Sequence, residues 1–334
     1  RDPMDRWFAL NVPAHRGLED RYHYLNARVV ALMGNWFDRG IARPEYQDPG
    51  DLEPIMDWTL KNRRQGKKCC IITVVSNAVR IARKALQAGI SLEHMTLAAS
   101  GEPLTQAKKR VIEEAGAHVA VRYGPGGLYG TALGCRDPQF IDEMHVPQSM
   151  FTFVENPRTL DYSGSLIHPL MQTATHPVAP RLLLNVENGD YATIIDRDCG
   201  CPLEKVGFIQ HIHTVRSFEK MTGEGMNYAG SELFELLEDV IPSEFGGGPG
   251  DYQLVEEEDD QAQTRLTLLV HPNVGELNEA KLLSWLEHGL AQGSRNHRFM
   301  AKIWQDADSF RIRREAPYAS VRGKILPLHV KQKL

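Results

Sequence analysis

Four short motifs follow one another between Ser100 and Cys201, and each comes after a strand-like run of residues. They are Ser100-Gly101-Glu102-Pro103, Arg122-Tyr123-Gly124-Pro125-Gly126-Gly127, Asn188-Gly189-Asp190-Tyr191 and Cys199-Gly200-Cys201. Taken alone, each motif is typical of an ordinary turn. Glycine at the end of a strand also lets the backbone approach a ligand closely. Their order along the chain therefore indicates a ligand site built at strand ends.

Strands and helices alternate around the first two motifs. We expect strands at 69–75, 95–99 and 118–121, with helices at 77–87 and 105–115 between them. This order predicts a parallel sheet with right-handed crossovers. Ser76 is expected to cap the first helix, and Lys108 to lie on the solvent side of the second.

Beyond Cys135 the pattern changes to that of antiparallel strands. We expect an irregular loop at 156–180, a strand at 181–186, and a hairpin turn at Asp190 whose return strand is Tyr191 to Ile195. Past Arg216, the sequence predicts helices at 231–240 and 277–291 and strands at 251–257, 265–270 and 299–304. The predicted class is α/β. A large domain with parallel and mixed sheets, incomplete at its N-terminus, covers 1–215, and a small α+β domain covers 216–334.

The composition is that of an ordinary globular protein. Hydrophobic residues make up 42% and charged residues 24% of the 334 positions. A net charge of -5 argues against a nucleic-acid binder. No apolar run approaches the roughly 20 residues that span a bilayer, and Arg1-Asp2-Pro3-Met4 does not resemble a signal peptide. We therefore expect a cytoplasmic protein without a membrane partner.

The chain has 5 cysteines. Cys69 and Cys70 lie in an apolar run, where we expect them to be plain core residues. Cys135, His145, Cys199 and Cys201 have the ligand types of a structural zinc site. Free thiols in the core are the alternative reading, and His211 and His213 stay open as alternative ligands because they alternate along one strand.

Taken in order, the motifs resemble the nucleotide site of the adenylate-forming ligases, the superfamily of acyl-CoA synthetases, and most closely its phenylacetate-CoA ligase branch. In that family a Gly-Glu-Pro turn and a Tyr-Gly turn cover the adenine. The matching residues here are Gly101, Glu102, Pro103, Tyr123 and Gly124. The resemblance further implies that Asp190 binds the ribose hydroxyls and that Arg216, which ends the large domain, contacts the nucleotide.

Two elements near the C-terminus extend the resemblance. The run Gly223-Glu224-Gly225-Met226-Asn227-Tyr228 resembles the family's loop that lines the pantetheine tunnel and introduces the small domain. It implies a CoA or hinge role for Gly223, Gly225 and Asn227. Val321-Arg322-Gly323-Lys324 resembles the family's Gly-Lys element. Lys324 would then be the catalytic lysine, which stabilises charge that develops during adenylation.

The resemblance implies a function with several cofactors and partners. ATP and magnesium would activate an aryl or acyl carboxylic acid as an acyl-adenylate, and transfer to CoA or to a carrier phosphopantetheine would follow. Some members of the branch carry Cys, His and Cys-x-Cys at the places of the four zinc candidates, which implies structural zinc. Partners would be the small-molecule acid and the nucleotide, while a carrier protein and a homodimer stay open.

The sequence also departs from the family pattern. The Ser/Thr/Gly-rich phosphate loop does not occur in it and is expected upstream of Arg1. Gly126 and Gly127 stand where the family has Thr or Ser and a magnesium-binding Glu. Two alternatives therefore stay open. One is an atypical member that adenylates without forming a thioester, or only binds a nucleotide or an aromatic acid. The other is a zinc-stabilised interaction module without chemistry.

Overall fold

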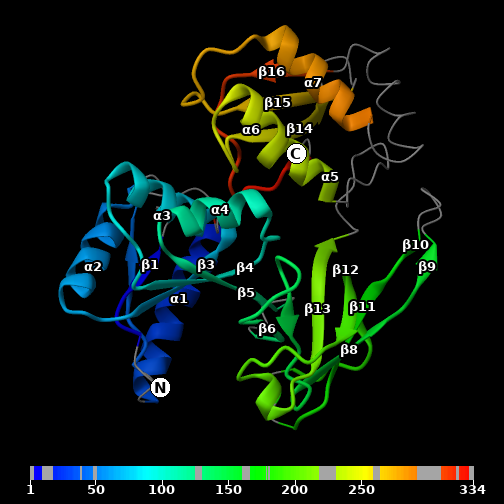
Figure 1. Ribbon diagram of the computed structural model, residues 1–334. Helices are drawn as coiled ribbons and strands as arrows, with labels where there is room; N and C mark the ends of the chain where they lie inside the picture. The colour runs from blue at the N-terminus through cyan, green and yellow to red at the C-terminus, as the bar shows by residue number, and fades with distance from the viewer. Residues whose placement is uncertain are drawn as a thin grey trace.

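The chain folds around one large and one small sheet. The computed structural model describes residues 4–9, 18–37, 40–47, 51–124, 130–159, 166–177, 179, 181–217, 231–258, 264–291, 310–320 and 323–330. Within these residues there is a nine-stranded sheet, a four-stranded sheet and two two-stranded ribbons. Figure 1 shows the four-stranded sheet and its helices above the helices α3 and α4 of the larger unit. The expected α/β class, with a large and a small sheet, is confirmed.

The first half of the large sheet is parallel. Its strands are β3 (Cys69–Val74), β4 (Met95–Ser100) and β5 (His118–Tyr123). The helices α2 (Glu53–Arg64), α3 (Val75–Gln87) and α4 (Gln106–Glu114) pack on it. Alanines on α3, including Ala78, Ala82 and Ala85, are fully buried, so the helix lies close to the sheet. Parallel strands joined by helices place the turns after β4 and β5 at the same edge.

Three local expectations for this half are wrong. The helix α3 begins at Val75, so the Ser76 side chain is not its cap and instead donates a hydrogen bond to Glu102. Lys108 is buried because it faces an acidic residue, Glu238, of the C-terminal part. Cys70 is exposed and Cys69 half-buried, because side chains alternate along β3 and Cys70 lies on the same exposed face as Ile72.

The second half of the large sheet is antiparallel. After β5 the strand order is β6 (Ala132–Gly134), β7 (Met144–His145), β13 (Gln210–Ser217), β12 (Val186–Asp196), β11 (Pro169–Ala174) and β8 (Phe151–Glu155). The expected loop at 156–180 is wrong in part, because it contains β11 and the ribbon of β9 (Arg158–Thr159) and β10 (Leu166–Ile167). The expected strand at 181–186 is also wrong, since β12 begins only at Val186.

Asp190 lies inside the continuous strand β12 and not in a hairpin turn. The Gly189 that suggested a turn does have a positive φ of 74°. The pairing register of β12 against β11 shifts across this glycine, between Glu187 and Tyr191. Such a shift marks a β-bulge, which glycine also favours. The chain therefore bends at Gly189 without reversing.

The C-terminal module, defined here as described residues 231–330, has its own core. Its sheet order is β16 (Phe310–Arg313), β15 (Thr264–Val270), β14 (Tyr252–Glu258) and β17 (Leu328–Val330). The helical segments are α5 (Ser231–Glu235), the π-helical turn η3 (Leu236–Val240), α6 (Ile241–Phe245) and α7 (Glu279–Ala291). Their apolar side chains pack with those of β14 and β15. The expected strand at 299–304 lies outside the described residues.

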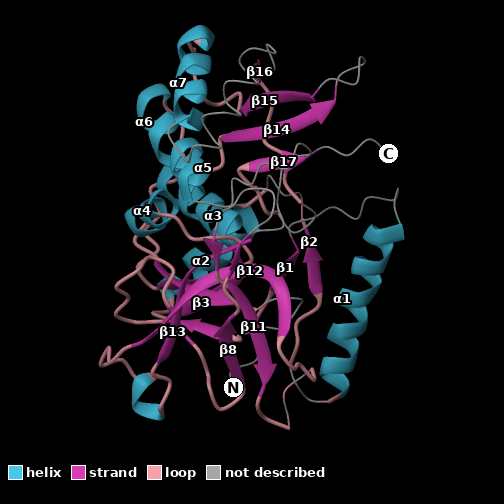
Figure 2. Ribbon diagram, turned by 90° about the vertical axis from the view of Figure 1, so that its right-hand side faces the viewer, coloured by secondary structure: helices cyan, strands magenta, loops and turns pink. Residues whose placement is uncertain are grey.

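The N-terminal elements lie at the side of the large unit. They are β1 (Trp7–Ala9), α1 (Leu18–Trp36) and β2 (Pro44–Tyr46), and Figure 2 shows α1 standing apart from the sheets. Among the described helices, none combines the length and apolar character that crossing a membrane requires. The domain boundary expected near Arg216 falls at the end of β13, and residues 218–230 beyond it lie outside the described residues. The boundary stays a prediction.

Candidate functional site

Glu102 lies in the turn after β4, against the first turn of α3. Its Oε2 atom accepts hydrogen bonds from the backbone N–H of Ser76 at 3.1 Å and from the Ser76 hydroxyl at 2.5 Å. Burial raises the pKa of Glu102, and the charges of Lys108 and Lys324 and the bonds from Ser76 oppose this rise only in part. The charges of two lysines from different parts of the chain therefore act on one carboxylate.

Lys324 reaches this turn from the C-terminal module. A Cβ atom added at Gly101 would lie 2.9 Å from the Cε atom of Lys324 and 3.1 Å from its Nζ atom. Gly101 also has a positive φ of 80°, a conformation that other residues rarely adopt. The backbone conformation thus favours glycine here, and a side chain would have to displace the end of Lys324. The structure brings together Gly101, Glu102 and Lys324, which the sequence placed in one site.

The backbone on either side of Lys324 is held by the start of α3. The N–H of Ile325 donates a hydrogen bond to the Ser76 hydroxyl oxygen at 3.2 Å. A Cβ atom added at Gly323 would lie 2.5 Å from Oδ1 of Asn77, so the two residues are in close contact. Ser76 therefore links Glu102 to the segment that carries Lys324. Sequence analysis missed this role, because the expected helix cap explained Ser76 without it.

Tyr123 and Asp190 form a second pair of predicted residues that meet. The Tyr123 hydroxyl, at the end of β5, donates a hydrogen bond to Oδ2 of Asp190 at 2.8 Å. Burial raises the pKa of Tyr123 far above its ordinary value, and the neighbouring carboxylate adds to this effect. The bulge at Gly189 lets β12 bring Asp190 to the strand end where Tyr123 lies.

Two other predicted nucleotide residues, Pro103 and Gly124, lie next to the ends of α4 and β5. Pro103 leads into α4, whose N-cap Thr105 accepts a hydrogen bond from the backbone N–H of Lys108. Gly124 directly follows β5. Gly126 and Gly127 lie outside the described residues, as do the CoA and hinge candidates Gly223, Gly225 and Asn227.

Arg216 lies apart from the Tyr123–Asp190 pair. In the strand register it stands opposite Tyr191, whereas Asp190 stands opposite Ser217. Because successive side chains alternate between faces, Arg216 and Asp190 belong to opposite faces of the sheet. The Arg216 guanidinium is buried and forms an ion pair of 2.9 Å with Asp142. Its expected contact with the nucleotide stays a prediction.

Asp142 is a residue that sequence analysis missed. Its Oδ1 atom accepts a hydrogen bond of 2.8 Å from the backbone N–H of Thr214, and its Oδ2 atom pairs with Arg216. Thr214 has a φ of 55°, which is strained for a β-branched residue. Asp142 thereby supports a distorted turn of β13. No pattern in the sequence distinguishes it from other acidic loop residues.

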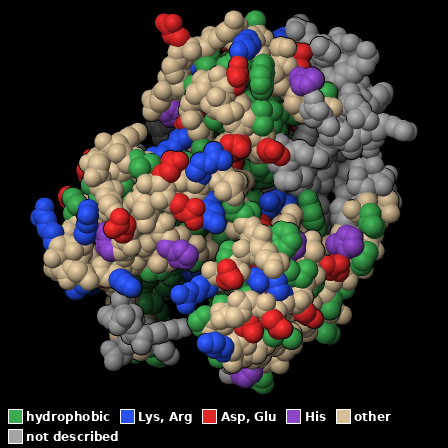
Figure 3. Space-filling model, viewed as in Figure 1, with side chains coloured by type: hydrophobic (Ala, Val, Ile, Leu, Met, Phe, Trp, Pro, Cys, Tyr) green, Lys and Arg blue, Asp and Glu red, His purple; other side chains and the backbone are tan. Residues whose placement is uncertain are grey.

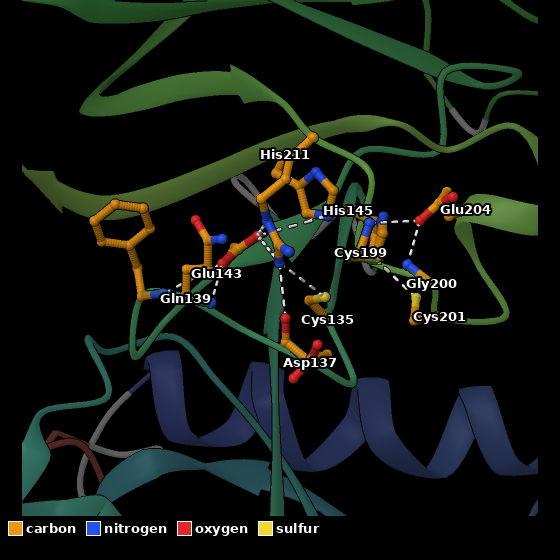
Figure 4. Close-up of polar contacts among 12 residues, drawn as sticks. Cys135, Asp137, Gln139, Glu143, His145, Cys199, Gly200, Cys201, Glu204 and His211 are labelled. Atoms are coloured by element: carbon orange, nitrogen blue, oxygen red, sulfur yellow. Dashed lines mark hydrogen bonds and ion pairs between the residues drawn. The ribbon is translucent and has the colours of Figure 1, made fainter.

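The four zinc candidates converge on one point (Figure 4). Cys135 follows β6, His145 ends β7, and Cys199 and Cys201 follow β12; their ligand atoms all lie within 4.8 Å of one another. The Nε2 atom of His145 is 3.0 Å from the sulfur of Cys201 and 3.5 Å from that of Cys199. The Nδ1 atom of His145 is 2.6 Å from the Phe208 carbonyl, which orients Nε2 toward the thiols.

The surroundings of the cluster favour the thiolate form of Cys201. Burial alone would raise the pKa of Cys201, but backbone N–H groups and the Cys199 thiol lower it to about 6. Burial raises the pKa of Cys199 to about 12. The carboxylate of Glu204 accepts hydrogen bonds from the backbone N–H groups of Cys199 and Gly200, so this loop is held tightly.

The two alternative ligands, His211 and His213, have different neighbours. His211 lies beside His145, with ring centroids 4.0 Å apart, and forms a second group of ligand atoms with Cys135 and Glu143. Glu143 is already paired with Arg197 at 2.6 Å. His213 stacks on the Phe140 ring and is in neither group found among the described residues. The set with three thiols and one imidazole is the one that fits zinc.

Comparison with known proteins gives likenesses of structure only. No protein-family model matches the chain, and no curated protein matches it. A solved structure of 2-hydroxyisobutyryl-CoA ligase in the postadenylation state, in complex with R3-HIB-AMP, is similar to it, with 17% identity and a TM-score of 0.55 over 90% of this chain. The chain spans 63% of the length of that protein.

Two further solved structures are similar to the chain with lower TM-scores. McyG A-PCP, complexed with phenylalanyl-adenylate, has 13% identity and a TM-score of 0.48 over 90% of this chain and 56% of its own. The anthranilate CoA ligase AuaEII, in complex with anthranoyl-AMP, has 12% identity and a TM-score of 0.45 over 96% of this chain and 58% of its own. Neither of these two likenesses strengthens the likeness to 2-hydroxyisobutyryl-CoA ligase. On that first likeness and the two-sheet architecture, the chain shares its fold with 2-hydroxyisobutyryl-CoA ligase.

Proposed function

We propose that this chain is part of an enzyme that uses ATP to activate a carboxylic acid as an acyl-adenylate. The observation that carries the proposal is the position of Lys324, which reaches from the C-terminal module to Gly101 and Glu102 at the strand ends of the larger sheet. A cation held in advance at the place where negative charge develops stabilises the transition state strongly. The similar 2-hydroxyisobutyryl-CoA ligase was solved with an adenylate.

The proposed roles of the other residues follow from their chemistry. Asp190 accepts hydrogen bonds from the ribose hydroxyls. Such bonds are stronger when the acceptor is charged than when it is neutral. Tyr123, held by its bond to Asp190, offers a flat face to the adenine. Gly101, Pro103 and Gly124 bring backbone close to the base, and Glu102 stands beside the catalytic lysine.

The second step of the proposed reaction transfers the acyl group to CoA or to a carrier phosphopantetheine. Gly223, Gly225 and Asn227 are the proposed CoA contacts, and Arg216 is a proposed nucleotide contact near the hinge. The acid is aryl or acyl. Gly126 and Gly127, which replace the family's magnesium-binding segment, favour a second candidate: a relative that binds nucleotide or aromatic acid without completing this sequence. If the enzyme is active, magnesium is held by residues other than these.

We further propose that Cys135, His145, Cys199 and Cys201 hold a structural zinc ion. The donor set is three sulfurs and one imidazole nitrogen, and the nitrogen is already oriented by the Phe208 carbonyl. All four positions of a tetrahedral site would be filled by protein, so the ion would support the fold and take no part in the reaction.

Two measurements test the proposed function. Titration calorimetry with ATP and AMP asks whether the nucleotide binds, and pyrophosphate release with a panel of aryl and aliphatic acids asks whether an adenylate forms. We expect both signals, with release that depends on one class of acid. Binding without release would support the second candidate. Absence of both would leave only the zinc-stabilised interaction module.

A further inference from the structure

A buried ion pair joins α4 to the C-terminal module. Lys108 on α4 is 2% exposed and Glu238 in the turn η3 is 5% exposed. The Nζ atom of Lys108 lies 2.7 Å from Oε1 of Glu238, and the Thr105 hydroxyl donates a hydrogen bond to Oε2 at 2.6 Å. Charged residues are rarely this buried unless they are paired. Both oxygens of Glu238 are thus engaged by the larger unit.

More contacts surround this pair. The ring of Phe234 on α5 has its centroid 5.4 Å from the Lys108 Nζ atom and 5.9 Å from the Arg216 guanidinium carbon. Arg83 on α3 forms two parallel hydrogen bonds with Asp251, of 2.9 Å and 3.0 Å. Figure 3 shows side chains of both charges where the C-terminal module meets the larger unit. The docked pose is therefore defined by several charged contacts.

The same pose places Lys324 at the candidate nucleotide site. In this pose Ile325 bonds to Ser76, and Lys324 lies against Gly101. The charges of Lys108 and Lys324 both act to lower the pKa of the Glu102 carboxyl, against the effect of burial.

A buried ion pair contributes little net stability, because the cost of removing two charges from water offsets their attraction. Instead, a buried ion pair determines which arrangement of the two parts of the chain is permitted. If one partner is removed, an uncompensated charge stays buried for as long as the module is docked. Undocking would return that charge to water. The loss of one partner therefore disfavours this pose and leaves undocked poses unaffected.

We propose that Glu238 is a positioning residue for Lys324. By neutralising Lys108 it permits the C-terminal module to dock in the pose that places Lys324 beside Gly101 and Glu102. The inference rests on the proposed function and extends it to a residue that touches neither the nucleotide nor the acid. Glu238 should matter for adenylate formation, which needs Lys324 in this position, and not for a later step that does not need the lysine there.

Three variants test this: Glu238→Gln, Lys108→Met and the double variant Lys108→Met/Glu238→Met. Adenylate formation is followed by pyrophosphate release without thiol, and the second step by consumption of a presynthesised acyl-adenylate with thiol. Each single variant should slow adenylate formation at least about tenfold and leave the second step unchanged. The double variant should recover most of the rate, because apolar side chains replace the pair without leaving a charge.

The matched control is Glu244→Gln, which removes the carboxylate of an exposed ion pair with Lys281 in the same module. It should change neither step. Equal slowing of both steps by Glu238→Gln, or a double variant as slow as the single ones, would overturn the proposal. Thermal melting shows whether each variant folds, and if Glu238→Gln does not, the comparison of Lys108→Met with the double variant decides.

Small-angle X-ray scattering separates this inference from the proposed function. Glu238→Gln should give a larger radius of gyration than wild type, and the double variant should return to the wild-type value. An unchanged radius in both single variants would overturn the proposal, whatever the activity. If wild type releases no pyrophosphate with any acid, the proposed function fails, and scattering alone decides whether the pair holds the docked pose.

Discussion

At the scale of single residues, the site depends on contacts that leave little freedom. The Tyr123 hydroxyl donates to Asp190, so the orientation of this carboxylate is set before any ligand arrives. Lys324 lies against Gly101, so a side chain at that position would displace the end of the lysine. The two pairs come from four separate segments of the chain. Each can be tested by one substitution with a control elsewhere.

Replacing Asp190 with alanine should weaken nucleotide binding. The proposed bonds to the ribose involve a charged acceptor, whose loss costs about 1–3 kcal/mol. Calorimetry with AMP measures the effect directly. Asp196→Ala, at the exposed end of the same strand, is the control and should bind AMP as wild type does. Unchanged affinity in Asp190→Ala would remove this residue from the site.

Replacing Gly101 with alanine should slow adenylate formation by about tenfold or more, because the new Cβ atom would displace Lys324 from a preorganised position. The substitution also strains a backbone with positive φ. Gly66→Ala controls for strain, since Gly66 has a φ of 66° and no atom near its missing Cβ. A similar rate loss in both variants would mean that strain, and not the lysine, explains the effect.

At the scale of elements, the alternation of strands and helices made the parallel half of the sheet predictable. The segments β3, α3, β4, α4 and β5 match it closely, because each buries one apolar face. The antiparallel half was harder. Gly189 has the positive φ expected of a turn, yet a bulge needs the same conformation. Local sequence does not distinguish a turn from a bulge, so it predicts a turn at Asp190. The ribose-binding role expected for Asp190 does not depend on that turn.

The Cys/His cluster shows the same division. Residue types and the family resemblance singled out four residues whose ligand atoms converge, although nothing local places Cys135 beside Cys201. That contact depends on β6 and β7 pairing within a sheet that also contains β12 and β13. The support from Glu204 and from the Phe208 carbonyl could not be predicted, since both contacts depend on the folded loop.

Replacing Cys199 with serine should lower both metal content and thermal stability. Protein purified without added zinc should contain about one zinc ion per chain, because binding energy at a closed site is also folding energy. Elemental analysis and thermal melting measure the two quantities. The control is Cys70→Ser, at an exposed cysteine outside the cluster, which should change neither. A metal-free protein of normal stability would contradict the zinc proposal.

At the scale of the whole molecule, the important fact is that the C-terminal module places Lys324 beside Gly101 of the larger unit. Lys108 illustrates why the sequence could not show this: its position on α4 suggests solvent, and only the distant Glu238 explains its burial. Interfaces between parts of one chain are often modest, so relative motion is the ordinary expectation. A pose held by a few charged contacts is suited to such motion.

The last prediction concerns Lys324 and the two proposed steps. Lys324→Ala should slow adenylate formation by at least about 100-fold, the usual scale for loss of one preorganised charge stabiliser. It should leave thioester formation from a presynthesised acyl-adenylate nearly intact, because that step does not need this lysine at Gly101. Lys281→Ala, an exposed lysine of the same module, is the control and should affect neither step. Equal loss in both steps would mean that Lys324 only supports the fold. No loss in either would mean that its contact with Gly101 has no role in the reaction.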